Sequence, residues 1–499
     1  MSMVSPEQAS TGPLQIVIVS NRGPFSFSMK DGEPVIERGS GGLVTAISSL
    51  ARQHEILWIS CALSKGDREW LDHVGDGVHT VQDMKIRLVV PDPEQYKQYY
   101  NVISNPLLWF VQHQLHDTPR LPVVDETTWR AWTEGYTAIN RQLAAATAES
   151  ITAIQGPVLV MPQDYHLYLF PRYLRELVGD RVVIQSFIHI PWPGPDAWRV
   201  LPLVIRQELL IAMLQADRIG FQTERDTRRF LQTCLDNLPK ARVVVPWRRI
   251  TYQNRETEAK PYPISVDVDE LKQLAGSVEA QSHHASMKLL SGSRRMILRV
   301  DRVEPSKNIL RGLMAYRNFL NVYPAYRGQV YMLALLVPSR TEVTEYKRYL
   351  RDIMALVGEI NATLGQSDWE PVRVMLGNNY IRALTALTQY DVLLVNPLAD
   401  GMNLVAKEGV ALNQRNGVLI LSEEAGVAEE FGEQALLVSP FDVYGAREAI
   451  YQALNMPQED RHSRAEKLAQ QVTDNDIHHW FARQLHDVQH DISTTESTT

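Results

Sequence analysis

Two carboxylates in the C-terminal third of the sequence are spaced so that they could hold the hydroxyl groups of a sugar or a ribose. Asp400 is the first residue and Glu408 the last residue of the stretch DGMNLVAKE, which follows the apolar run 391–395. The run is typical of a buried parallel strand, and the Gly-Met-Asn step of a turn into a helix. Ligands of open α/β sheets bind at the carboxyl ends of strands. We therefore expect Asp400 at the rim of such a crevice, with Glu408 about two helical turns beyond it.

A pair of cations follows another apolar run. Arg302 and Lys307 come just after residues 296–300, where both could reach a diphosphate at the end of the strand. Arginine offers a planar fork of donors and lysine a point charge. The alternative is a solvated charge pair at the start of a helix.

The first strand of the chain also ends in a cation. Arg22 follows the run 15–19, and the glycine run 39–42, which contains Gly41 and Gly42, precedes a helical pattern at 43–52. Glycines let backbone N–H groups approach an anion at a helix N-terminus. A surface loop is the competing interpretation.

Three further positions combine polar or aromatic chemistry with a strand end. His189 ends the run 182–188, and Asp164 occupies the equivalent place after 158–161. A hydrogen-bonded core histidine and a helix N-cap aspartate are the alternatives. Tyr100 and Trp109 belong to an aromatic and amide-rich segment, although aromatics at this spacing are more often core residues.

Composition excludes several classes of protein. The 499 residues are 44% hydrophobic and 22% charged, with a net charge of −8, so we expect a soluble globular protein without nucleic-acid partners. Two cysteines exclude a disulfide framework, and the sequence has no metal-binding or Walker motif. No apolar stretch reaches the roughly 18 residues of a membrane helix. We expect a cytoplasmic enzyme with no metal, cofactor or membrane partner, and leave open whether it is a homo-oligomer.

The elements that position these residues alternate between strand and helix patterns. We expect strands at 15–19, 56–60, 158–161, 182–188 and 218–221 in the first half, and at 296–300, 330–336, 372–375, 392–395 and 417–421 in the second. Such alternation predicts parallel sheets with crossover helices, and the length predicts two domains. We expect an α/β fold of two Rossmann-like, doubly wound domains facing across a cleft. The expected boundaries are an N-terminal domain at 13–265, a polar linker at 266–287, a C-terminal domain at 288–472 and a returning C-terminal helix at 473–490.

In their joint order, five segments resemble glycosyltransferase family 20, the trehalose-6-phosphate synthases and their relatives. The resemblance runs from about Gln15 to Trp480 and rests on VSNR, YYN with the later Trp109, DYHL, HIPWP and DGMNLVAKE. It implies a GT-B fold and a retaining transfer of glucose from a nucleoside diphosphate glucose to a phosphorylated acceptor. Glucose 6-phosphate, giving α,α-trehalose 6-phosphate, is the simplest acceptor. No enzymic nucleophile is implied.

The resemblance also implies site residues. His189 would touch the donor sugar near the reacting carbon, and with Arg302, Lys307 and Asp400 would form the catalytic group. Arg302 and Lys307 would clamp the diphosphate, and Glu408 would bind the ribose. The other implied donor contacts are Gly41, Gly42, Asp400, Gly401, Met402, Asn403 and Leu404. The implied acceptor contacts are Arg22, Tyr100, Trp109, Asp164 and Arg340.

The chain departs from the family pattern at some positions. Ala399 replaces an arginine, Gln163 replaces a histidine, and the residues 304–308, EPSKN, replace DYSKG. The segment 377–380 differs from the uridine-preferring type, which leaves UDP, GDP and ADP as donor bases. The alternatives are a glucosylglycerol-phosphate synthase, a pseudo-glycosyltransferase using another phosphorylated acceptor, and a catalytically silent regulatory subunit.

Overall fold

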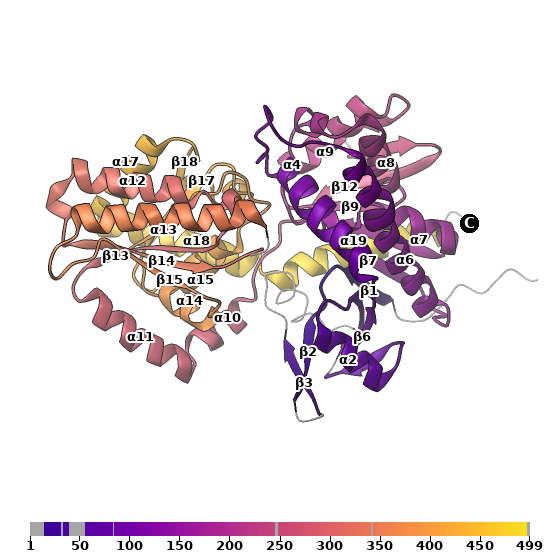
Figure 1. Cartoon of the computed structure of the whole chain (residues 1–499), viewed down its shortest axis with the longest axis horizontal. Helices are drawn as coiled ribbons and strands as arrows, with labels where there is room; N and C mark the ends of the chain where they lie inside the picture. The colour runs from indigo at the N-terminus through magenta and orange to yellow at the C-terminus, as the bar shows by residue number, and fades with distance from the viewer. Residues whose placement is uncertain are drawn as a thin grey trace, which may run out of the picture. The chain divides into compact units, whose positions relative to one another are not determined.

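The computed structural model describes residues 14–30, 33–38, 55–82, 84–244, 248–340 and 343–496. The chain forms two compact units (Figure 1). Unit 1 comprises Met1–Tyr262 and Phe481–Thr499, and unit 2 comprises Pro263–Trp480. The last helix, α19 (Ile477–Glu496), therefore begins in unit 2 and ends in the segment that belongs to unit 1.

Unit 1 is built on a ten-stranded sheet with the order β10-β11-β12-β9-β8-β7-β1-β4-β6-β5. Its strands are β1 (Gln15–Ser20), β4 (Ile56–Cys61), β5 (His79–Val81), β6 (Met84–Val89), β7 (Val158–Pro162), β8 (Val182–Phe187), β9 (Arg218–Phe221), β10 (Arg242–Val244), β11 (Arg249–Tyr252) and β12 (Arg255–Pro261). The core strands are parallel, and β1 pairs with β4 on one side and β7 on the other. The strand order thus reverses beside β1, where open α/β sheets leave a crevice.

The strands predicted at 15–19, 56–60, 158–161, 182–188 and 218–221 are confirmed. The helices of unit 1 before β8 are α2 (Lys65–Val74), α3 (Pro93–Lys97), η1 (Gln98–Trp109), α4 (Phe110–Gln112), α5 (Glu126–Arg130), η2 (Ala131–Thr137), α6 (Ala138–Ile151), η3 (Tyr165–Leu167), α7 (Phe170–Val178) and η4 (Gly179–Arg181). After β8 come η5 (Pro195–Val200), α8 (Leu203–Met213) and α9 (Glu224–Asn237).

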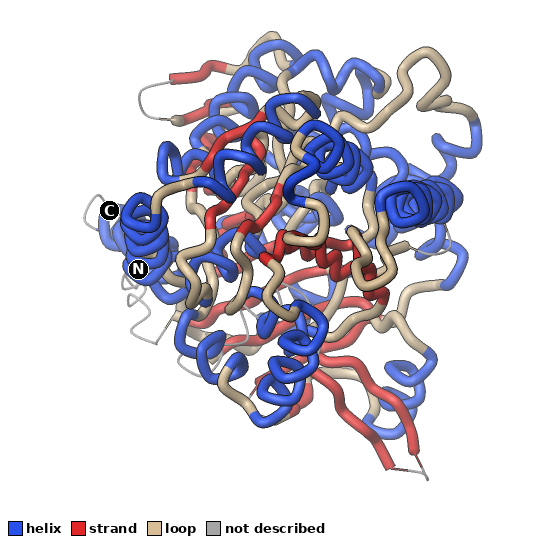
Figure 2. The backbone as a smooth tube through the Cα atoms, turned by 90° about the vertical axis from the view of Figure 1, so that its left-hand side faces the viewer, coloured by secondary structure: helices blue, strands red, loops and turns tan. Residues whose placement is uncertain are grey.

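A separate hairpin of β2 (Phe25–Lys30) and β3 (Glu33–Arg38) extends beyond the large sheet (Figure 2). The ring of Phe27 stacks on Trp70 of α2 with centroids 4.1 Å apart. Asp67 joins the two elements, because its carboxylate accepts the Phe27 N–H at 3.1 Å and the Ser64 N–H at 2.8 Å. Ser64 caps α2 in return, so one aspartate both starts the helix and holds the hairpin.

Unit 2 has a six-stranded, wholly parallel sheet with the order β15-β14-β13-β16-β17-β18. Its strands are β13 (Arg295–Arg302), β14 (Val330–Val337), β15 (Val372–Leu376), β16 (Val392–Val395), β17 (Val418–Ser422) and β18 (Leu436–Val438). The first five occupy the predicted positions, which confirms those strands. The order reverses between β13 and β16, so residues that follow these two strands meet at the switch point.

Helices cover both faces of this sheet (Figure 1). They are α10 (Val268–Ala275), α11 (Val278–Ser291), η7 (Pro305–Lys307), α12 (Ile309–Val322), η8 (Pro324–Tyr326), α13 (Thr344–Leu364), α14 (Tyr380–Leu387), α15 (Leu404–Leu412), α16 (Ala428–Phe431), η9 (Gly432–Gln434), α17 (Val443–Asn455) and α18 (Gln458–Asp474). The polar stretch 266–287, expected as a linker, contains α10 and most of α11.

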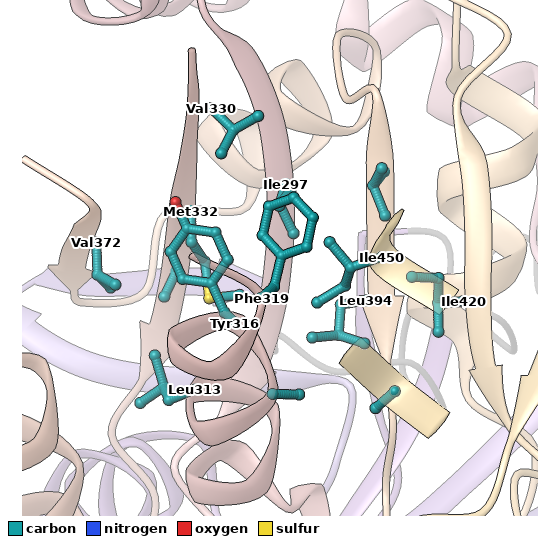
Figure 3. Close-up of a cluster of buried hydrophobic side chains, with 14 of the residues drawn as sticks. Ile297, Leu313, Tyr316, Phe319, Val330, Met332, Val372, Leu394, Ile420 and Ile450 are labelled. Atoms are coloured by element: carbon teal, nitrogen blue, oxygen red, sulfur yellow. The ribbon is translucent and has the colours of Figure 1, made fainter. Parts of the chain in front are cut away.

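The core of unit 2 lies between the sheet and α12, α13 and α17. Tyr316 and Phe319 of α12 lie against Ile297 of β13 and Met332 of β14, and Ile450 of α17 lies beside Leu394 and Ile420 (Figure 3). All seven of these side chains are fully buried. This packing fixes the strand ends from which the polar residues of the site emerge.

Candidate functional site

The loop after β13 carries both predicted diphosphate cations of unit 2. Arg302 ends the strand with a half-exposed side chain, whereas Lys307 ends η7 and is mostly buried. The Lys307 ammonium lies 2.5 Å from the Asp400 carboxylate, which also accepts a hydrogen bond from the Asn403 amide at 3.0 Å. The structure thus joins the cation after β13 to the carboxylate after β16 at the switch point.

Glu304 lies between the two cations and was not predicted as a site residue. Its side chain is fully buried, and its Oε1 is 3.0 Å from Arg302 Nη1 and 3.1 Å from Arg340 Nη1. The Ser339 hydroxyl donates to the same oxygen at 2.8 Å. Burial alone would raise the pKa of Glu304, but Arg302, Arg340 and Lys307 outweigh that effect and lower the pKa to about 2. Glu304 is therefore an anion at physiological pH.

A buried arginine supports this loop from below. Arg299 on β13 is completely buried, forms an ion pair with Asp301 at 2.7 Å and donates to Asn396 Oδ1 at 2.6 Å. Its other terminal nitrogen donates to the main-chain carbonyl of Lys307. Gly312 on α12 leaves space for the Arg299 side chain, since an added Cβ would lie 2.2 Å from the guanidinium. The backbone that presents Lys307 is thus fixed independently of its side chain.

The nonapeptide forms the predicted turn into a helix. Asn403 has a left-handed backbone (φ 82°) and caps α15, its side chain accepting the Ala406 N–H at 3.0 Å. Leu404 is the first residue of α15. The segment beyond β17 holds the preceding residues, because the Gly426 N–H donates to the Asp400 carbonyl and the Val427 N–H to the Met402 carbonyl, both at 3.0 Å. The five predicted donor positions 400–404 therefore share one short, capped turn.

Glu408 lies on α15, half-buried, and contacts Tyr380 at the start of α14. The tyrosine hydroxyl donates to the carboxylate at 2.9 Å. Burial raises the pKa of Glu408 to about 7, although the hydrogen bond from Tyr380 opposes the shift. This carboxylate can therefore change its charge near neutral pH, unlike Glu304.

Lys407 of the same motif has a structural contact that the sequence did not reveal. It is buried with 1% of its surface exposed, forms an ion pair with Glu430 at 2.8 Å and donates to the Ile264 carbonyl at 2.9 Å. Burial lowers the pKa of Lys407, while Glu430 opposes that shift. The lysine thus ties α15 to the first residues of unit 2.

In unit 1, Arg22 follows β1 with an exposed side chain, and Asp164 and His189 follow β7 and β8. Asp164 precedes η3 but makes no side-chain cap there, which differs from the N-cap alternative. Its backbone is left-handed (φ 72°), and its carboxylate accepts the His189 N–H at 3.1 Å. The structure therefore brings Asp164 and His189 together through the main chain of the histidine.

Both ring nitrogens of His189 face side-chain amides. Nε2 lies 2.9 Å from Gln163 Oε1, and Nδ1 lies 3.4 Å from Gln222 Nε2. Because Gln163 offers an acceptor and Gln222 a donor, Nε2 carries the proton. Burial lowers the pKa of His189 to about 3, so the ring is neutral at physiological pH. The alternative of a hydrogen-bonded histidine thus describes this side chain.

Tyr100 and Trp109 lie at the two ends of the π-helical segment η1. Tyr100 stacks between Tyr96 and His166, with centroid distances of 5.7 and 5.9 Å. Trp109 is almost fully buried and stacks on His113 at 3.9 Å. Arg22 and Tyr100 both influence Tyr96 electrostatically, which brings these two predicted residues to one neighbourhood.

Some predicted residues lie apart from these groups or outside the structure. Arg340, expected with the acceptor residues, belongs to unit 2, where its guanidinium bonds Glu304 and the Tyr346 hydroxyl, the latter at 2.6 Å. Gly41 and Gly42 lie outside the described residues. Within the described part of the chain, no cluster of His, Cys, Asp and Glu side chains could hold a metal ion. None of the described helices combines the length and apolar character of a membrane span.

Two units, each with a largely parallel sheet whose switch point carries polar residues, define the chain as a GT-B glycosyltransferase. The chain belongs to glycosyltransferase family 20, whose model matches residues 14–490. It is 31% identical over 491 residues to a Schizosaccharomyces pombe alpha,alpha-trehalose-phosphate synthase (UDP-forming), covering 95% of this chain and 91% of the relative. The resemblance seen in the sequence is confirmed.

Solved structures agree with this membership. A Burkholderia xenovorans alpha,alpha-trehalose-phosphate synthase (UDP-forming) in complex with glucose-6-phosphate is 28% identical, with a TM-score of 0.82 and coverage of 95% of this chain and 100% of the other. An E. coli trehalose-6-phosphate structure bound with UDP-2-fluoro glucose is 29% identical, with a TM-score of 0.82 and coverage of 95% and 98%. The predicted GT-B fold is confirmed.

Proposed function

We propose that this enzyme transfers glucose, with retention, from UDP-glucose to glucose 6-phosphate and so forms α,α-trehalose 6-phosphate. The observation that carries the proposal is the ion pair of Lys307 and Asp400 at the switch point of unit 2, with Arg302 beside it. A cation and a sugar-binding carboxylate are the two groups that a nucleotide sugar needs at its anomeric end. The UDP-forming relatives support uridine as the donor base.

The ion pair suggests how the donor binds. When the diphosphate enters, Lys307 exchanges the Asp400 carboxylate for phosphate oxygens, and the carboxylate becomes available to the hydroxyls of the donor glucose. Arg302, half-exposed, turns toward the same diphosphate. Fixed cations stabilise the charge that develops on the leaving group as the glycosidic bond breaks. Glu408 then accepts hydrogen bonds from the ribose, and the turn 401–404 lines the glucose.

No side chain needs to act as a nucleophile. Asp400 is held by Asn403 and is assigned to the hydroxyls of the donor glucose, and Glu304 is held by its cations. His189 has amides at both ring nitrogens and is neutral, so we assign it to sugar positioning near the reacting carbon instead of proton transfer. The departing phosphate oxygen takes the proton of the incoming hydroxyl.

For the acceptor we assign Arg22, Tyr100 and Trp109 of unit 1, and Arg340 of unit 2, to the phosphate. Asp164 is assigned to the sugar ring. Gly41 and Gly42 keep their predicted role over the nucleotide. A guanidinium with free surface, as in Arg22, suits a charged ligand that arrives from solvent.

We also place the activity in the cytoplasm, which remains a prediction. Both cysteines, Cys61 and Cys234, are buried free thiols, as suits a reducing compartment. Fractionation of cells that produce the protein would check this placement.

The test is a matrix of UDP-, GDP- and ADP-glucose against glucose 6-phosphate, glycerol 3-phosphate and free sugars, scored by nucleotide release and by NMR of the product. We expect release with UDP-glucose and glucose 6-phosphate and an α,α-linked disaccharide phosphate. Release with glycerol 3-phosphate alone would favour a glucosylglycerol-phosphate synthase. Release in no combination would favour a silent subunit.

A further inference from the structure

One carboxylate oxygen of unit 2 serves two cations that the proposed function assigns to different substrates. Glu304 Oε1 lies 3.0 Å from Arg302, assigned to the donor diphosphate, and 3.1 Å from Arg340, assigned to the acceptor phosphate. The carboxylate is fully buried. A buried charge is stable only when it is paired, so Glu304 and its two arginines form one unit of structure.

The two arginines are held to different degrees. The Arg340 side chain is 9% exposed, donates to the Tyr346 hydroxyl at 2.6 Å and lies over that ring at 5.3 Å. The Arg302 side chain is 49% exposed. Arg302 can therefore present the exposed part of its guanidinium to a ligand while its Nη1 stays on Glu304, and Arg340 keeps its place. Ser339, which donates to the same oxygen at 2.8 Å, holds the carboxylate itself in position.

We propose that Glu304 is a positioning residue that aims Arg302 and Arg340 at once and thereby sets the affinity for donor and acceptor together. This inference rests on the proposed function. Without the carboxylate, two guanidiniums would share a small volume, and their repulsion would turn both away from the positions in which they meet phosphate. Glu304 touches neither substrate and acts only through the two arginines.

The test uses the full chain and calorimetric dissociation constants for UDP and for glucose 6-phosphate, measured separately. We expect Arg302→Ala to weaken the binding of UDP and Arg340→Ala to weaken the binding of glucose 6-phosphate. Glu304→Gln should weaken both, each by about tenfold, as expected for loss of one charged hydrogen-bond partner. In steady-state assays the KM values for donor and acceptor should rise together, with a smaller change in kcat.

Double variants sharpen the test, because residues that act as a unit are not additive. When Glu304→Gln is added to Arg302→Ala, the dissociation constant for UDP should stay at the value of Arg302→Ala, while that for glucose 6-phosphate should still rise. When it is added to Arg340→Ala, the constant for glucose 6-phosphate should stay unchanged and that for UDP should rise. Fully multiplicative effects, or an effect of Glu304→Gln on one ligand only, would overturn the inference. If instead the single arginine variants bind both ligands normally, the proposed function itself is wrong.

Two further variants control for folding. Glu258→Gln in unit 1 also removes a carboxylate from a buried arginine, Arg218, which it meets at 2.7 Å. It should lower the melting temperature without changing either dissociation constant. If Glu304→Gln does not fold, Glu304→Asp keeps the charge but draws it back from both arginines. Its two constants should rise by similar factors, and a change in only one would contradict the shared role.

Discussion

The predicted site residues of unit 2 and those of unit 1 are held by opposite kinds of interaction. In unit 2, Lys307 rests on Asp400, an anion that a phosphate must replace, and Arg302 rests on Glu304, which keeps its place. In unit 1, His189 is held by neutral amides, and Tyr100 and Trp109 by ring stacking. Only Arg22 among them presents an exposed charge.

This difference separates what each region contributes. Ion pairs keep the cations of unit 2 in position when no substrate is bound, and the anionic ligand enters by exchange. In unit 1 the amide contacts of His189 fix the orientation of a ring that stays neutral between pH 5 and 9. Charge substitutions should therefore act most strongly in unit 2, and shape or affinity effects should dominate in unit 1.

Removal of the Lys307 ammonium should have the largest effect. Lys307→Ala deletes a cation at the leaving diphosphate, and we expect turnover to fall by about 10²–10³-fold. The fold should persist, because Arg299 holds the main-chain carbonyl of residue 307 and Asn403 still bonds Asp400. UDP release and a thermal melt measure the two expectations. Near-normal UDP release by Lys307→Ala would show that Lys307 does not belong to the site. Lys347→Ala, at an exposed position on α13, serves as the control.

The sequence predicted many of the strands and the polar residues that follow them. Continuous apolar runs predicted β1, β4, β7, β8, β9 and β13–β17, because parallel strands buried on both faces need such runs. The polar residues that follow them fell at strand ends for the same reason. Asp400, Lys307 and Arg302 could therefore be placed at one switch point before their contacts were seen.

The remainder depends on contacts that no local pattern encodes. Strand β12, RETEAKP, has charged residues at four of its seven positions, and β11, RITY, is only four residues long. The hairpin β2–β3 packs on α2 through one aromatic pair. None of these strands has a long apolar run. Glu304 lies between the two predicted cations, and that position was the only signal of its role. Gln222 and Tyr380 reach His189 and Glu408 from distant parts of the chain.

Arg22 provides the next largest effect, and it lies in unit 1. Arg22→Ala removes a charged hydrogen-bond donor from the acceptor's phosphate, so the KM for glucose 6-phosphate should rise by about tenfold or more. The KM for the donor should change far less. Steady-state kinetics with each substrate varied in turn checks this split. Equal shifts would mean that the phosphate pocket is misplaced, and Arg130→Ala, an exposed arginine of α5, should change neither.

Glu408 should make the binding of the donor depend on pH, and this effect is smaller than those of Lys307 and Arg22. Its pKa of about 7 means that the carboxylate is mostly protonated at pH 6 and mostly ionised at pH 8. Only the ionised form accepts two ribose hydroxyls, so UDP-glucose should bind up to about tenfold more tightly at pH 8 than at pH 6. Calorimetry without acceptor measures this.

Two variants test the cause of that pH dependence. Glu408→Gln should flatten the profile, because no carboxylate remains to titrate. Tyr380→Phe should move it to higher pH, because the tyrosine hydroxyl lowers the pKa of Glu408. A profile that is the same in all three proteins would exclude Glu408 as its origin.

His189 should contribute the smallest effect, because it should add no pH dependence to the natural protein. A single substitution beside it should create one. Its pKa of about 3 predicts no histidine inflection in kcat/KM between pH 5 and 9. Gln163→Glu would place a carboxylate about 2.9 Å from Nε2 and so favour the imidazolium, raising the pKa of His189. NMR of the ring and the pH profile should then both show a new titration. Gln163→Leu, which breaks the same hydrogen bond without adding charge, should show none, because burial lowers the pKa of His189. A new titration in Gln163→Leu would contradict burial as the cause.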